Sequence, residues 1–257
     1  MSSDFNNKTC DLLNLNDYMK SFTIICNSNQ HIAYLADEND IIIAISNDFK
    51  KKFGIENNEQ ILNHTFETQS ISSLNTYKTI SAELSQQNKL IRDTRQKRIY
   101  MDIINGVTTS DLFIVHKTPI FDFESNFLCI HAQIRAFSFA RLINIVMKTV
   151  GIKGFPICKE DFMHIELTRP QQMVLYLYVR NYSYKEVSIW LNRLGHNISA
   201  AMVNKTLDQL KTIFKVRDKE ALRDISLKLG YDTALPAGFI RDGSYDITDD
   251  VFDLWVV

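Results

Sequence analysis

The chain has 257 residues, of which 45% are hydrophobic and 23% charged, and its formal net charge is −1. This length suits one large or two ordinary domains, and the composition is that of a soluble globular protein. No run approaches the roughly 20 apolar residues that span a bilayer, so we expect no membrane partner. Residues 1–11 carry acids and lack an apolar core, which excludes a signal peptide and favours a cytoplasmic location.

Residues 31–66 predict a hairpin followed by a helix. Two short runs of β-branched or aromatic residues flank a DEND turn, which is typical of paired strands. Helical spacing then places Phe49 and Phe53 on one face, with Asn47 or Asp48 as the capping residue.

A longer helix and three more strands follow. Residues 77–97 predict a helix with one polar face, and the segments 98–104, 111–122 and 126–137 predict strands. Two strands, short helices and then three strands indicate an α+β fold, in which helices pack on one face of an antiparallel sheet.

Residues 20–140 resemble a PAS sensor domain. The resemblance lies in the second strand running into Asn47, the pair Phe53–Gly54, and the strand, reverse turn and last strand at 118–137. It implies that this half holds a small molecule or haem, or dimerises.

The cofactor remains open. Photosensing PAS domains that bind flavin carry an Asn-Cys-Arg-Phe-Leu run, whereas residues 63–66 read NHTF, which argues against light sensing. A haem would need an axial ligand, for which His64, His116 and His131 are available. His116 and His131 lie in predicted strands, where a histidine usually has a structural role, so we do not expect haem. A small-molecule ligand stays as an alternative to an empty pocket.

Residues 141–165 predict a linker helix and a loop. The segment 139–150 has a broad apolar stripe, which either packs on the sensor sheet or pairs with its twin in a dimer. The following GIKGFPICKED run, with two glycines and a proline, is typical of a loop between domains.

Residues 166–231 predict a helix-turn-helix unit that resembles the DNA-binding domain of LuxR-type regulators. Motifs of that family occur in order at Leu167, Thr168, Val174, Leu175, Ser183, Lys185, Glu186, Val187, Ile198, Ser199, Val203, Lys215, Val216 and Arg217. The chain departs from the family at Gln171, Asn181 and Met202, and NRLGH adds about a turn between two helices. Residues 160–231 hold 11 basic and 8 acidic residues, a mild excess that suits phosphate binding.

Helical geometry nominates the residues that would contact double-stranded DNA. With Val203 and Leu207 facing the core, the opposite face of the recognition helix carries four candidates for base contacts: Ala201, Asn204, Lys205 and Asp208. Six residues suit phosphate contacts: Ser183, Lys185, Ser199, Lys211, Lys215 and Arg217. A single mildly basic unit offers little contact, so we expect a homodimer.

Residues 232–257 form a tail in which large apolar side chains alternate with acids. It holds 1 basic and 6 acidic residues, and Phe239, Phe252 and Trp255 make disorder a poor interpretation. We expect the tail to pack on the protein's own surface or on a dimer mate; the alternatives are a protein partner or shielding of the basic recognition surface.

The sequence thus predicts a signal-responsive, DNA-binding transcriptional regulator that acts as a homodimer. The alternative is a protein-interaction adaptor that keeps both folds and has lost specific DNA binding. No cluster supplies a nucleophile with a base, a phosphate loop or metal ligands, so we do not expect an enzyme.

Overall fold

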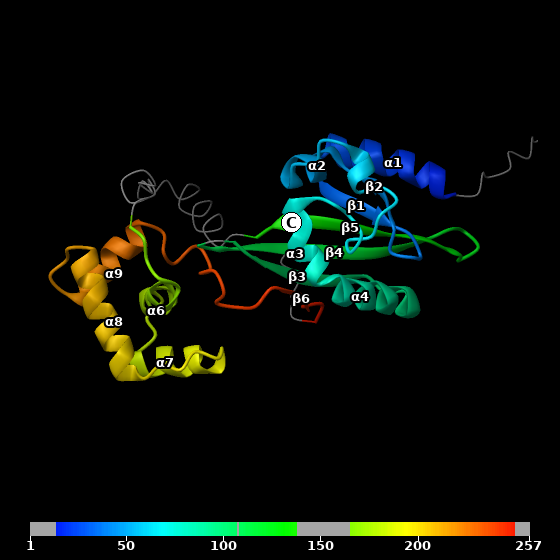
Figure 1. Ribbon diagram of the computed structural model, residues 1–257. Helices are drawn as coiled ribbons and strands as arrows, with labels where there is room; N and C mark the ends of the chain where they lie inside the picture. Colours follow the sequence, from blue (N-terminus) through cyan, green and yellow to red (C-terminus); the bar gives the residue numbers. More distant parts are fainter. Residues whose placement is uncertain (1–13, 107, 138–164, 250–257) are drawn as a thin grey trace, which may run out of the picture. The chain divides into compact units, whose positions relative to one another are not determined.

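The computed structural model describes residues 14–106, 108–137 and 165–249, which form two compact units (Figure 1). The first unit contains residues up to 102, together with 113–135 and the residues from 243 onward. The second contains 103–112 and 136–242. The predicted helix at 139–150 and most of the predicted linker lie outside the described residues.

A six-stranded sheet forms the centre of the first unit. Its strand order is β2-β1-β5-β4-β3-β6, and β1 pairs antiparallel with both β2 and β5. The strands are β1 (Ile32–Ala36), β2 (Ile42–Ile45), β3 (Arg98–Asn105), β4 (Ser110–Phe121), β5 (Phe127–Ala136) and β6 (Gly243–Asp246). The predicted antiparallel α+β fold is confirmed.

The helices α2 (Asn47–Phe53), α3 (Asn75–Thr79) and α4 (Ser81–Thr94) belong to the sheet face that carries Tyr34. Edge-to-face rings fill this side, with Tyr34 5.8 Å from Phe49 and 5.2 Å from Phe66 between centroids. Two short 3₁₀ turns, Asn58–Gln60 and Ser72–Leu74, connect α2 to α3.

The cap of α2 differs from the prediction. Ser46, one residue before Asn47, accepts a hydrogen bond from the Phe49 amide at 3.1 Å and donates one to the His31 carbonyl at 2.6 Å. Because one buried hydroxyl serves both groups, it fixes where β2 ends and α2 begins.

A helix that the sequence patterns did not reveal covers the opposite face. Helix α1 (Leu15–Ser28) buries Phe22 and Cys26 in a cluster with Leu35 and Cys129. Leu35 points away from Tyr34 because successive strand residues face opposite sides of a sheet. The sheet is therefore covered by helices on both faces.

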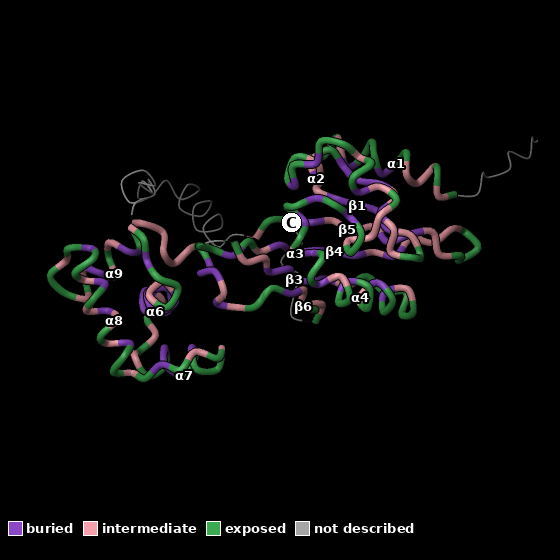
Figure 2. Tube along the Cα trace, in the orientation of Figure 1, coloured by how far each residue is buried: buried purple, intermediate pink, exposed green. Residues whose placement is uncertain are grey.

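Four helices form most of the second unit: α6 (Arg169–Val179), α7 (Tyr184–Arg193), α8 (Ala200–Ile213) and α9 (Lys219–Lys228). Each begins after a polar N-cap residue: Thr168, Ser183, Ser199 and Asp218. Helix α6 is the centre of this core, since every residue from 173 to 179 is buried (Figure 2).

The tail begins by packing inside the second unit. Ala237 donates its amide to the Thr108 carbonyl at 3.0 Å, and Gly238 donates to the Asn105 side chain at 2.7 Å. The Phe239 ring lies 5.3 Å from that of Tyr176 on α6. The chain then enters the first unit as β6, beside β3.

Candidate functional site

The recognition helix α8 presents a clear division between a buried and an exposed face. Ser199 caps its first turn by accepting from the Met202 amide at 3.2 Å, and Val203, Leu207 and Leu210 are fully buried. Ala201 and Lys205, two of the predicted base-contact residues, are exposed. The predicted helix, cap and core face therefore occur together, and these two side chains are available to a ligand.

Asn204 and Asp208, the other two predicted base-contact residues, are half-buried and already have partners. Lys219, at the start of α9, donates to the Asn204 side-chain oxygen and lies 3.7 Å from Asp208. Lys211 forms a closer ion pair with Asp208, at 3.0 Å. Sequence spacing missed Lys219, because it lies on another helix and reaches α8 only through tertiary packing.

Further exposed residues of α7 and α8 escaped the sequence analysis. Gln209 lies one turn after Lys205 on the exposed face of α8, and the Met202 side chain is 52% exposed. On α7, Ile189 and Trp190 are each 42% exposed. Gln209 follows from the same i, i+4 rule that nominated Lys205. The apolar residues carried no sequence signal that separates them from core positions.

The predicted phosphate-contact residues lie at the start of α7 and at the two ends of α8. Ser183 and Lys185 begin α7, and Ser199 precedes α8, whereas the three cationic residues lie at or after its last turn: Lys211, Lys215 and Arg217. A 14-residue helix is about 20 Å long, so Ser199 and this cationic group lie about one helix length apart. The Ser183 hydroxyl also donates to Glu186 at 2.7 Å, within a capping box.

The lengthened turn between α7 and α8 has its own hydrogen bonds. The Asn192 side chain accepts from the Ile198 amide at 2.8 Å and donates to the Ile198 carbonyl at 2.9 Å. Gly195 has a φ of +88°, where a side chain would strain the backbone. The inserted turn is therefore a defined connection between the two helices.

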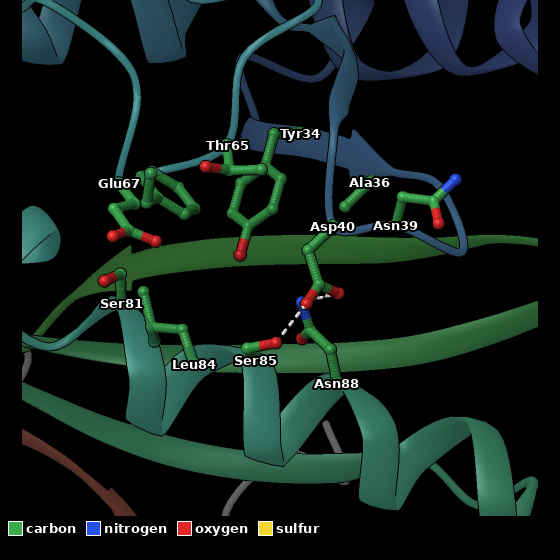
Figure 3. A pocket seen from close by; sticks show the side chains of 11 residues that line it. Tyr34, Ala36, Asn39, Asp40, Thr65, Glu67, Ser81, Leu84, Ser85 and Asn88 are labelled. Atoms are coloured by element: carbon green, nitrogen blue, oxygen red, sulfur yellow. Dashed lines mark hydrogen bonds between the residues drawn. The ribbon is translucent and has the colours of Figure 1, made fainter.

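The first unit contains a cavity of about 220 Å³ between the sheet, the segment 65–67 and α4 (Figure 3). Tyr34, Phe66 and Leu84 supply its apolar lining, and several polar side chains complete it. Ligand pockets usually occupy about 300–1,000 Å³, so this cavity suits a small molecule.

Asp40 organises one end of the cavity. It accepts hydrogen bonds from Ser85 at 2.5 Å and from Asn88 at 3.0 Å (Figure 3). It also accepts one from Arg92 at 2.8 Å, and all three donors lie on α4. These bonds join the β1–β2 turn to α4 and place polar groups beside the apolar lining.

Behind this end lies a buried cationic group, Lys117 on β4. Its ammonium group donates to Gln87 at 3.0 Å and to Asn88 at 2.9 Å, and burial lowers the pKa of Lys117 to about 8. Burial also raises the pKa of Asp102, which accepts a hydrogen bond from Ser244 on β6. The Gln87 amide donates in turn to the Ser244 carbonyl at 3.1 Å. Through Lys117, Gln87 and Ser244 the cavity is thus connected to the tail.

The histidines are placed as follows. His131 accepts or donates in a 2.9 Å hydrogen bond with Tyr18 and packs against Phe22 on the α1 side of the sheet, away from Tyr34. His64 and His116 do not line the cavity.

Within the described ranges, no three His, Cys, Asp or Glu residues gather as metal ligands, and no helix there has the length and apolarity to cross a membrane.

Comparison with family models and with curated proteins finds no match. Among solved structures, the chain is similar to Vibrio cholerae VqmA in a complex with ligand and DNA: identity is 17%, the TM-score is 0.58, and 86% of this chain and 93% of that one are covered. It is also similar to a phage VqmA in a complex with DPO, with 16% identity, a TM-score of 0.59, and 90% and 96% covered. The chain has the VqmA fold.

This likeness confirms the predicted fold, an antiparallel α+β unit followed by a helical unit. Both structures are covered over more than nine-tenths of their length, so the similarity includes both units. At such low identity it establishes the fold, while individual contact residues rest on the geometry above.

Proposed function

We propose that this chain is a ligand-responsive regulator whose helix-turn-helix unit binds specific duplex DNA. The observation that carries the proposal is the recognition helix, which exposes Ala201, Lys205 and Gln209 opposite a fully buried core face. A structure of the same fold is a complex with both ligand and DNA, which supports this assignment. An α-helix with such a polar face fits the major groove.

The base-reading set comprises Ala201, Asn204, Lys205 and Asp208, and the phosphate-binding set is Ser183, Lys185, Ser199, Lys211, Lys215 and Arg217. The first set lies along α8, and the second lies at the start of α7 and at the two ends of α8, so base contacts and phosphate contacts come from different residues. We further propose that two copies of the chain bind together, because one such unit gives a small interface.

The sensor cavity is the proposed site of the signal molecule. Its volume of about 220 Å³ and its apolar wall with polar groups at one end, including Asp40 and Asn88, suit a small, partly polar molecule. DPO is bound by a phage protein of this fold and is the first compound to test.

The proposed route of the signal is the C-terminal segment. Gln87 accepts a hydrogen bond from Lys117 and donates one to the Ser244 carbonyl on β6. A molecule that breaks the hydrogen bond between Lys117 and Gln87 would therefore also alter the hydrogen bond to β6. Residues 237–239 lie a few positions upstream and are tied to the second unit through Thr108 and Tyr176. A shift of β6 would thus act on the packing around α6 through the chain itself.

Selection of bound sequences from a random duplex pool tests the function. The expected result is one enriched motif for the wild-type protein, with a symmetric repeat if two copies bind. DPO binding measured by calorimetry, and the affinity for the enriched duplex with and without DPO, test the signal. If no motif is enriched, the regulator proposal is wrong.

An adaptor is the second candidate, favoured by one observation. Ile189, Trp190 and Met202 expose apolar surface on α7 and α8, which could contact a protein. A wild-type protein that enriches no duplex sequence but binds a protein partner, together with loss of that partner in Trp190→Ala, would support this role.

A further inference from the structure

Lys219, the first residue of α9, links three elements of the second unit. Its ammonium group donates to the Asn204 oxygen and lies 4.9 Å from the centre of the Tyr184 ring at the start of α7. Its carbonyl accepts a hydrogen bond from Tyr178 on α6 at 3.0 Å. The side chain is 24% exposed, so packing restricts it to this position.

The chemistry of the neighbours fixes the orientation of the Asn204 amide. An ammonium group has donors only, so the atom that faces Lys219 must be the amide oxygen. On the other side, the Asn204 nitrogen lies 3.5 Å from the Asp208 carboxylate. Hydrogen bonding from Lys211 lowers the pKa of Asp208, so at neutral pH this carboxylate only accepts. Both neighbours require the same orientation.

This orientation limits what Asn204 can read. A free asparagine recognises adenine by donating to N7 and accepting from the N6 amino group together. Lys219 occupies one of the two lone pairs of the Asn204 oxygen, and its positive charge repels the adenine N6 amino group that would use the other. An N–H of the Asn204 nitrogen is therefore the favoured contact to a base. Base edges that present acceptors alone, the guanine N7 and O6 pair or thymine O4, match this donor.

We propose that Lys219 is a positioning residue that determines specificity by making Asn204 a donor-only reader of guanine or thymine. The inference rests on the proposed function, since it concerns how the same DNA-binding surface chooses its sequence. It differs from the preference for adenine that Asn204 alone would give.

The experiment uses the full chain and a random duplex pool. Selection with Asn204→Ala first maps the base pair that Asn204 reads, because preference should relax at that position only. Lys219→Met then removes the ammonium group and keeps a stem of similar length over Tyr184. Lys219→Arg restores a donor-only partner, and Lys228→Met, at an exposed lysine of the same helix, is the charge-matched control.

The expected result is a guanine or thymine preference in the wild type and a shift towards adenine in Lys219→Met. A bidentate pair contributes about 1–3 kcal/mol, so the adenine-to-guanine ratio should rise about 5- to 150-fold. Lys219→Arg should keep the wild-type preference, and Lys228→Met should only weaken binding. If Lys219→Met does not fold, Lys219→Gln replaces it, because its amide can accept as well as donate and so frees Asn204.

A wild-type motif with adenine at the mapped position, or a motif that Lys219→Met leaves unchanged, overturns the inference alone. An Asn204→Ala motif identical to that of the wild type also overturns it, since Asn204 then reads nothing. Failure of the wild-type protein to enrich any sequence overturns the proposed function, and this inference with it.

Discussion

Ser244→Ala removes the hydroxyl through which β6 holds a buried carboxyl group. Asp102 is 2% exposed and accepts from Ser244. A hydrogen bond to a charged group contributes about 1.5–3 kcal/mol, and the substitution leaves its buried acceptor without that donor. We expect the free energy of unfolding of the first unit to fall by about this amount once Asp102 is ionised.

The loss should depend on pH in a stated direction. Burial raises the pKa of Asp102 above its ordinary value of 3.8, and the Ser244 hydrogen bond opposes this rise. A carboxyl group with a raised pKa in the folded state favours folding most when it is protonated, and this contribution is lost as pH rises through the folded-state pKa. Without Ser244 that pKa is higher still. The free energy of unfolding that Ser244→Ala loses relative to the wild type should therefore be small at acidic pH and should grow as Asp102 ionises.

Hydrogen exchange of the full chain, read in peptides from β3, β4 and β6, measures the local free energy of opening at several pH values. Ser85→Ala is the matched control, because Ser85 also donates to a carboxylate, Asp40, at 2.5 Å, but at the protein surface. The control should cost at most about 1 kcal/mol. If both variants lose the same free energy of opening, or if the loss in Ser244→Ala grows towards acidic pH, the Ser244 hydrogen bond to ionised Asp102 does not stabilise this unit.

Three further predictions concern the second unit. Asn192→Ala should lower its unfolding free energy by about 1–3 kcal/mol, since two hydrogen bonds to Ile198 are lost; a urea titration that matches the wild type would contradict this. Leu207→Ala should cost about 2–5 kcal/mol because the side chain is fully buried, and circular dichroism on heating measures the loss. Lys215→Ala should weaken binding to every duplex alike and reduce the salt slope of the affinity by about one; a sequence-dependent effect would exclude a phosphate contact.

Local signals in the sequence predicted the helix-turn-helix well. Ser183 and Ser199 precede helices that begin where capping chemistry requires, and Val203 and Leu207 repeat at the spacing of a buried face. These signals depend on near neighbours in the chain, so they can be read without the fold.

The elements that were missed depend on distant partners. Helix α1 buries only Phe22 and Cys26 completely, while Ile24 and Ile25 are exposed, so its sequence does not separate core from surface positions. Strand β6 has four residues, GSYD, and forms because it pairs with the edge strand β3. The residues of β6 alone carry no pattern that predicts this pairing. The choice of Ser46 over Asn47 as a cap likewise depends on the His31 carbonyl across the hairpin.

The same distinction applies to the recognition helix. Spacing placed Asn204, Lys205 and Asp208 on one face, and α8 has that face. It could not show that Lys219 would engage two of the three. Reading a base requires free donors and acceptors, and these are set by neighbouring helices as much as by the helix itself.

The proposed route of the signal also sets the size of the response. A ligand can shift an equilibrium only by the difference in its affinity for the two states. The connection from the cavity to β6 runs through Gln87. Its bond to the Lys117 ammonium group contributes about 1.5–3 kcal/mol, and its neutral bond to the Ser244 carbonyl contributes about 0.5–1.5 kcal/mol. Rearranging the stronger bond would change DNA affinity by about 10- to 150-fold. A signal that acts through β6 alone can therefore change DNA affinity only within this range. A larger change in DNA affinity would require a change in how two copies of the chain associate.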